Sequence, residues 1–262
     1  MPVTSTPPKS IGASLLSFVR DVVVILAIAI VVSFLVKTFL IRSFFIPSAS
    51  MQTTLMSPDG SVGREADRVI VNELVPDIMP ISRGDIVVFR DPGGWLPAKS
   101  STTSANPLEA GVEWLMSLFG LASPDSNEHL IKRVIGLPGD TIVCCEPTGE
   151  LTINGTPVVE PYINANSEGL ASAVDFTVTV PEGALWVMGD NRNNSADSRF
   201  HPNEPGRGFV GIDDVVGRAF VISWPIDRWS WLSNYSEVFL NVPLPPALPA
   251  GFESTPTVSP RG

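Results

Sequence analysis

The chain has 262 residues, which is enough for a membrane anchor and one domain of moderate size. Its 17 basic and 27 acidic residues give a net charge of −10, which argues against a nucleic-acid partner because such a partner requires a basic surface. The 25 prolines and 21 glycines predict frequent turns and few long helices.

A long apolar run lies near the amino terminus. Continued to Ile41, it covers residues 22–41, and a helix of that length spans ~30 Å, the thickness of a bilayer core. A cleaved signal peptide is the main alternative, since Ser48-Ala49-Ser50 is typical of a small-x-small cleavage site. The run is longer than the usual ~7–15 apolar residues of such a peptide, which favours a retained transmembrane helix. Basic residues nearly balance across the run, so charge leaves its orientation open.

A short polar stretch, Ile46 to Met51, follows this run. Pro47 stiffens the backbone in an extended conformation, in which residues two apart face the same side. Ser48 and Ser50 can therefore converge on one substrate atom. Taken alone, however, the stretch is more typical of a polar turn after a hydrophobic helix.

The rest of the chain reads as short strands separated by turns. β-branched or apolar strand patterns cover residues 69–72, 85–89, 130–135, 141–145, 151–153, 157–159, 176–180, 185–188 and 215–224. Asn154-Gly155 between two of them predicts a hairpin turn. The fold class that we predict is mainly β, an antiparallel sheet or barrel-like domain.

Three segments lie outside these strands. Residues 99–107 are rich in Ser and Thr and predict an exposed loop. Residues 108–121 predict a short helix packed on the core, with a membrane-contacting amphipathic segment as the alternative. Prolines recur through residues 239–262 and predict a disordered tail.

Cys144 and Cys145 are the only cysteines. Neighbouring side chains in a strand point to opposite faces, so we expect two partly buried thiols and treat a disulfide between them as the less favoured alternative. The only histidines are His129 and His201, and we identify no further ligands that would join the cysteine pair in a metal site, so we predict no metal and no cofactor.

Lys132 lies in an apolar run, between Leu130-Ile131 and Val134-Ile135. A serine hydroxyl needs a base to become a nucleophile, and neither histidine lies in a recognisable triad motif. Burial among apolar side chains lowers the pKa of a lysine, and the neutral amine can then serve as that base. A strand lysine that points to solvent is the alternative, and one strand alone does not exclude it.

Four blocks, taken together and in this order, resemble type I signal peptidase. They are the serine stretch from Phe44, Arg83 to Phe89, His129 to Asp140, and Gly189 to Arg199. That family comprises membrane-anchored Ser/Lys proteases that remove signal peptides from exported proteins. The sequence Asp91-Pro92-Gly93-Gly94-Trp95-Leu96 resembles that of the enzymes of high-GC Gram-positive bacteria.

The resemblance implies a domain organisation. It comprises a cytoplasmic segment (1–21), a transmembrane helix (22–41), a catalytic β core in two parts (43–143 and 181–238), a small β insertion between them (144–180) and the Pro-rich tail (239–262). It also implies a single-pass protein of the cell membrane with an extracytoplasmic catalytic domain. The implied partners are the lipid bilayer and the signal peptides of preproteins emerging from the export machinery, with no nucleic acid.

The resemblance also implies roles for single residues. Ser50 matches the nucleophile and Lys132 the general base, while the Ser48 hydroxyl and the Ser50 N–H match the oxyanion hole. Ser195 matches the serine that orients the lysine. Arg133, Asp197 and Arg199 match a structural ion cluster near the site, and Asn193 departs from the family, which often has Asp there. The side chains that match the shallow pockets for small substrate residues are Phe44, Ile46, Met51, Leu55, Leu130 and Ile131.

Three other functions compete with this one. A self-cleaving Ser/Lys repressor lacks the anchor and has a DNA-binding segment. A penicillin-binding enzyme requires Ser-x-x-Lys, and Ser50-Met51-Gln52-Thr53 lacks the lysine. A catalytically inactive, membrane-anchored β module that binds peptides would not need the serines and the lysine together.

Overall fold

The computed structural model describes residues 11–58, 65–96, 129–145, 149–163, 170–249 and 251–260. The chain divides into two units, Met1–Ile41 and Arg42–Gly262. The predicted loop 99–107 and the predicted helix 108–121 lie outside the described residues.

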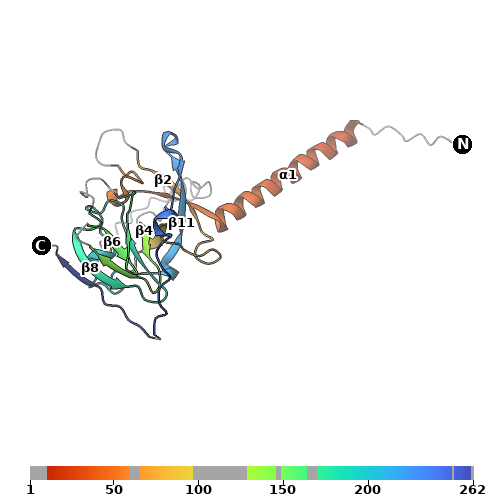
Figure 1. Cartoon of the computed structure of the whole chain (residues 1–262). Coiled ribbons are helices and arrows are strands. Elements are labelled where there is room, and N and C mark those ends of the chain that lie inside the picture. Colours follow the sequence, from red (N-terminus) through yellow and green to blue (C-terminus); the bar gives the residue numbers. More distant parts are fainter. Residues whose placement is uncertain are drawn as a thin grey trace, which may run out of the picture. The chain divides into compact units, whose positions relative to one another are not determined.

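The first unit contains the helix α1 (Ile11–Phe39) (Figure 1). Its stretch Ser17–Phe34 has a mean hydropathy of 2.3 and is not buried within the protein, so α1 is long and apolar enough to cross a membrane. The helix begins well before residue 22 and ends two residues before Ile41, where the first strand begins. The helix therefore begins before the predicted span 22–41, because apolar composition marks the part that a bilayer can hold while backbone hydrogen bonds set where the helix ends.

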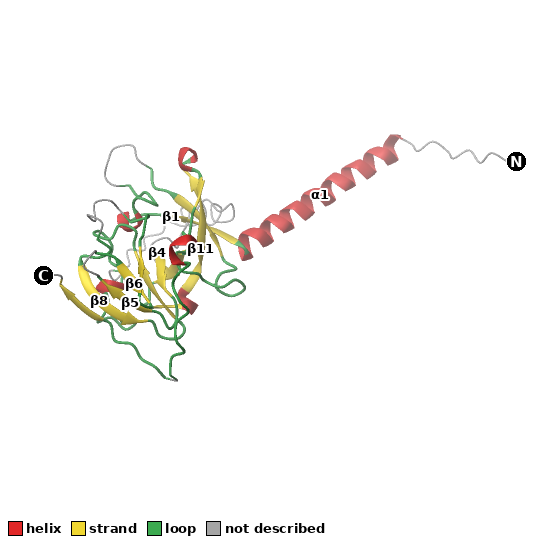
Figure 2. Ribbon diagram, viewed as in Figure 1, coloured by secondary structure: helices red, strands yellow, loops and turns green. Residues whose placement is uncertain are grey.

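The second unit consists mainly of two antiparallel sheets (Figure 2). The larger sheet has the strand order β1-β2-β11-β3-β4-β9-β10, with β12 paired to β11. Its strands are β1 (Ile41–Phe45), β2 (Arg68–Asn72), β3 (Ile86–Arg90), β4 (His129–Gly136), β9 (Ala184–Met188), β10 (Val210–Gly211), β11 (Val215–Trp224) and β12 (Ser230–Trp231). The predicted fold class, mainly antiparallel β with one N-terminal apolar helix, is confirmed.

The smaller sheet has the order β13-β8-β5-β6-β7. Its strands are β5 (Thr141–Cys144), β6 (Leu151–Ile153), β7 (Thr156–Val158), β8 (Val174–Thr179) and β13 (Thr257–Pro260). The predicted hairpin at Asn154-Gly155 is confirmed: it joins β6 to β7, and both residues have positive φ, which glycine and asparagine adopt most readily. Short 3-10 helices complete the described elements, namely η1 (Ala49–Met51), η3 (Ser198–Phe200), η4 (Ile212–Asp214), η5 (Ile226–Arg228) and η6 (Ser236–Phe239).

The prediction of a disordered tail is corrected by the last strand. β13 pairs with β8 from Thr257 to Pro260, and Phe239 and Val242 are buried in the core beside the smaller sheet. Proline removes only a donor, so a Pro-rich chain still pairs at a sheet edge and still buries its apolar side chains. The smaller sheet thus takes its last strand from the tail, and it begins at Thr141 rather than at the predicted residue 144.

Cys144 and Cys145 form a disulfide, which corrects the prediction of two thiols. β5 ends at Cys144, so the alternation that keeps neighbouring side chains apart no longer applies to Cys145. The two sulfurs and the carboxylate of Asp175 lie within 4.8 Å of one another. Metals bind thiolates, which a disulfide does not offer, so this group gives no metal site in the form seen.

The strand β4 runs through the middle of the larger sheet and carries Lys132 and Arg133. It pairs with β3, where Lys132 lies opposite Val87, and with β9, where Arg133 lies opposite Met188. Because strand residues alternate between faces, these two cations enter different faces of the sheet, and both are buried. The solvent-facing alternative for Lys132 is excluded.

Candidate active site

The serine stretch is anchored by the apolar residues around it. Phe44, Ile46, Met51 and Leu55 are buried in one core cluster with residues of β2, β3 and β11. Each such side chain contributes about 1.5–3 kcal/mol when it is fully buried. Between them, Ser48 is extended and Ser50 lies in η1, so the polar hydroxyls sit on a segment fixed at both ends.

Ser50 and Lys132 are in direct contact, although 82 residues separate them in the chain. The Lys132 Nζ lies 2.8 Å from the Ser50 Oγ and donates to the Ile131 carbonyl at 3.0 Å. The Ser48 Oγ lies 3.1 Å from the Ser50 Oγ. The structure thus brings together a nucleophile, an amine that can take its proton, and a second hydroxyl.

The environment of Lys132 lowers its pKa from 10.5 to about 8. Burial is the largest cause, because it penalises the charged ammonium. The carboxylates of Asp197 and Asp190 oppose the shift, and the Arg199 guanidinium adds to it by repulsion. The predicted lowering is confirmed in direction and cause, while the opposing carboxylates were not anticipated.

A loop formed by Gly189, Asp190 and Asn191 holds the serine stretch in place. The Asn191 N–H donates to the Ser50 carbonyl at 3.0 Å, and its side-chain amide donates to the Ala49 carbonyl at 3.1 Å. The Thr54 hydroxyl donates to Asp190 at 2.6 Å. Gly189 has no Cβ, and one built there would collide with the Ser50 carbonyl and the Ser195 hydroxyl, so only glycine lets the loop approach so closely.

A cavity of about 180 Å³ opens beside Lys132. Its lining includes Ser48 and Lys132 together with apolar side chains of β1, β3 and β4. Four of the predicted pocket residues line it: Phe44, Ile46, Leu130 and Ile131. Met51 and Leu55 do not line it, because both are fully buried in the core below. Leu96 lines it as well and was not among the predicted pocket residues.

Residues 19–224 match the family model of signal peptidase, peptidase S26. The chain belongs to this family. It is 39% identical over 208 residues to a probable signal peptidase I of Mycobacterium leprae (strain TN), covering 72% of this chain and 70% of that protein. It is 38% identical over 225 residues to a signal peptidase I of Mycobacterium tuberculosis (strain ATCC 25618 / H37Rv), covering 81% of this chain and 75% of that protein. The resemblance to the high-GC Gram-positive type is confirmed.

A solved structure is also similar to this signal peptidase family member. It is the crystal structure of a signal peptidase I from Enterococcus faecalis V583, with 28% sequence identity and a TM-score of 0.33. The match covers 53% of this chain and 95% of that chain.

The predicted ion cluster consists of two separate buried pairs in this chain. Arg133 binds the two oxygens of Asp190 at 2.8 and 2.7 Å, and Arg199 binds Asp197 in the same two-pronged way, at 2.8 Å each. Asp197 also accepts from the Gly189 N–H at 2.9 Å. Burial opposes the ionisation of Asp197, but Arg199 and these hydrogen bonds outweigh it and lower its pKa. Removing one member of such a pair costs ~3–5 kcal/mol.

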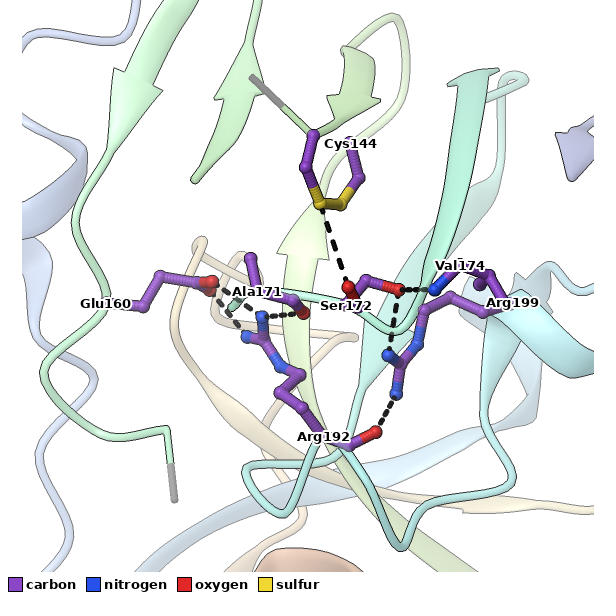
Figure 3. Close-up of a disulfide and its surroundings, with 8 residues drawn as sticks. Cys144, Glu160, Ala171, Ser172, Val174, Arg192 and Arg199 are labelled. Carbon is purple, nitrogen blue, oxygen red and sulfur yellow. Dashed lines mark hydrogen bonds and ion pairs between the residues drawn. A yellow bond between two sulfur atoms is a disulfide. The ribbon is translucent and has the colours of Figure 1, made fainter. Parts of the chain in front are cut away.

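Glu160 and Arg192 form a third buried ion pair (Figure 3). It joins the segment after β7 of the smaller sheet to the loop that begins at Gly189. Arg192 also donates to the Ala171 carbonyl at 2.8 Å, and Arg199 donates to the Arg192 carbonyl at 3.0 Å and the Ser172 hydroxyl at 3.1 Å. In the same view the disulfide lies above Ser172, with the Cys145 sulfur 4.0 Å from its carbonyl. Glu160 belongs to none of the four blocks, so no sequence signal pointed to this pair.

Ser195 is buried next to Gly189, but no hydrogen bond joins its hydroxyl to Lys132 in the described part of the chain. The Ile131 carbonyl and the Ser50 hydroxyl are the two partners of the lysine amine seen here. The role of Ser195 in orienting Lys132 therefore remains a prediction.

Proposed function

We propose that this chain is a membrane-bound serine endopeptidase that removes N-terminal signal peptides from exported preproteins and cuts after small residues, as in Ala-x-Ala. The observation that carries the proposal is the buried Lys132 amine at 2.8 Å from the Ser50 hydroxyl. Membership of the signal peptidase family supports the substrate class.

Ser50 attacks the carbonyl of the scissile bond while Lys132 takes its proton. The amine must be neutral to do so, and a pKa of about 8 leaves ~10% of it neutral at pH 7, whereas a free lysine is ~0.03% neutral. The lysine ammonium then gives the proton to the leaving amine, and the signal peptide stays bound to Ser50 as an ester. Lys132 next takes a proton from water, which attacks the ester. The lysine returns that proton to the Ser50 oxygen as the bond to the signal peptide breaks, which releases the signal peptide and restores the enzyme.

Ser48 and the Ser50 N–H stabilise the negative oxygen that forms during each attack. The Ser48 hydroxyl lies 3.1 Å from the nucleophilic oxygen, close enough to act on an oxygen that forms there. One such donor contributes ~3–4 kcal/mol to catalysis. Arg133, Asp197 and Arg199 hold the loop beside the site, and the charges of Asp197 and Arg199 also act on the pKa of Lys132. Ser195 orients the lysine once substrate is bound.

The apolar helix α1 is long enough to anchor the enzyme in the lipid bilayer. The orientation that we propose puts the amino-terminal segment, predicted as residues 1–21, in the cytoplasm and the β domain outside. That orientation places the active site on the side where signal peptides emerge from the export machinery. Treating cells stripped of their wall with a protease tests it, because the β domain should be digested. Protection of that domain, with a control surface protein digested, would reverse the orientation.

The experiment that tests the function is incubation of the purified full-length protein with a preprotein in detergent, followed by sequencing of the new amino terminus. We expect one cut, directly after a small residue at the end of the signal peptide. Binding of the preprotein without cleavage would instead support an inactive peptide-binding module.

A further inference from the structure

The loop Asp91 to Leu96 follows β3 and takes no part in the chemistry proposed above. Its backbone is held by the Asp91 carboxylate, one oxygen of which accepts from the N–H groups of Gly93 at 2.9 Å and Trp95 at 3.1 Å. The other oxygen accepts from the N–H of Leu96 at 3.1 Å. One side chain thus satisfies three backbone donors and fixes the loop up to Leu96.

Trp95 pins the same loop to the core. Its ring stacks on His201 at 4.4 Å between centroids and meets Phe89 edge-on at 5.8 Å, and only 7% of the residue is exposed. Aromatic pairs of this kind add ~0.5–1.5 kcal/mol each beyond the burial of their surface. Leu96 therefore extends from a loop whose backbone is held by Asp91 and whose preceding residue, Trp95, packs in the core.

Leu96 contributes to the cavity beside Lys132, with Leu130 and Ile131 of β4. We infer that Leu96 is a specificity-determining residue: its side chain limits the size of the substrate side chain that this cavity accepts. The inference rests on the proposed function, because it takes the cavity as a subsite for the signal peptide. The wall that Leu96 supplies comes from a loop that carries none of the predicted pocket residues.

The cavity suits the third substrate residue before the cut better than the first. Alternate residues of an extended substrate face the same side, ~6–7 Å apart, so both of these residues point toward the enzyme. The first carries the carbonyl that Ser50 attacks, and a pocket for its side chain must border Ser50. Neither Ser50 nor Met51 lines the cavity in the described part of the chain, whereas Phe44 and Leu96 do.

The test compares cleavage of two peptide libraries by the full-length wild type, Leu96→Ala and Leu96→Phe in detergent. One library varies the third residue before the cut with Ala fixed at the first, and the other varies the first with Ala fixed at the third. We expect Leu96→Ala to raise the ratio of kcat/KM for Leu over Ala at the third position by at least about tenfold, since even one methylene is worth ~10–200-fold in an apolar pocket. Leu96→Phe should lower the ratio for Val over Ala at that position.

Leu137→Ala is the matched control. Leu137 is another half-buried leucine packed against the core cluster that holds Trp95, and it does not line the cavity. Its substitution should leave both profiles as in the wild type. Each ratio is measured on one enzyme sample, so a partly unfolded variant changes the rates without changing the ratio.

An unchanged third-position profile in both Leu96 variants would overturn the inference, and so would a change confined to the first position. The same profile change in Leu137→Ala would overturn it too, because the effect would then come from general loosening of the core. A wild type that cleaves no peptide would instead refute the proposed function.

Discussion

Replacing Lys132 with methionine should stabilise the fold at neutral pH, although it removes the proposed base. A lysine pKa lowered from 10.5 to about 8 means that the folded state penalises the ammonium relative to the unfolded state. The difference corresponds to ~3 kcal/mol, since each pKa unit is ~1.4 kcal/mol. The lost hydrogen bond to the Ile131 carbonyl offsets ~1 kcal/mol of this, so we expect a net gain of about 2 kcal/mol at pH 7.

The sign of the pH dependence follows from which state holds the proton. Below pH 8 the lysine is charged in both states, and the folded state bears the whole penalty. Between pH 8 and 10.5 the folded lysine is neutral while the unfolded one is charged, so the penalty fades as the pH rises. It should fall from ~3 kcal/mol at pH 7 to ~2 kcal/mol at pH 9. The advantage of Lys132→Met should therefore shrink by about 1 kcal/mol over that range.

The assay is guanidinium unfolding of the detergent-solubilised proteins at pH 7 and pH 9, followed by tryptophan fluorescence. Wild type and Lys132→Met share every other titrating group, so their difference isolates Lys132. Ser50→Ala keeps the lysine and should show the wild-type pH dependence. A stability difference between wild type and Lys132→Met that is the same at both pH values, or that favours the wild type at pH 7, would refute a buried lysine with a lowered pKa.

Three further predictions concern catalysis. The value of kcat/KM should rise about tenfold per pH unit up to about pH 8 and then level off, because neutral Lys132 is the active form; an acid limb near pH ~4 would mean that a carboxylate titrates instead. Ser48→Ala should lower kcat ~100-fold or more with little change in KM, and an effect on KM alone would assign Ser48 to substrate binding. Asn191→Ala should lower kcat ~5–10-fold in steady-state assays, because the Ala49 carbonyl loses its donor at 3.1 Å and the serine stretch is held less firmly; normal kcat would show that the backbone contact suffices.

The fold class could be predicted from sequence because local pattern determines the strands, whereas the catalytic candidates came from the family resemblance. Alternating and continuous apolar residues mark the strands, and the apolar neighbours of Lys132 predict its burial and lowered pKa. Its contact with Ser50 could not be predicted from spacing, because the register of β3 with β4 and the path of residues 46–51 bring them together. That pairing came from the family resemblance.

The remaining differences arise where tertiary packing chooses between equivalent local patterns. Arg133 could pair with any nearby carboxylate, and the turn after β9 gives it Asp190 rather than Asp197. Met51 and Leu55 are as apolar as the residues that line the cavity, but they point into the core cluster. Leu96 is separated from the pocket residues of β4 by 33 or more positions, so no local pattern places it beside them.

The central claim is that Ser50 and Lys132 work as one unit in cleaving signal peptides. The most direct test is the rate of preprotein cleavage by the wild type, Ser50→Ala, Lys132→Ala and the double variant, each checked for a cooperative unfolding transition. We predict that each single variant loses cleavage as completely as the double variant does, because neither residue has a function without the other. Near-normal turnover by Lys132→Ala, with the cut at the wild-type position, would contradict the account.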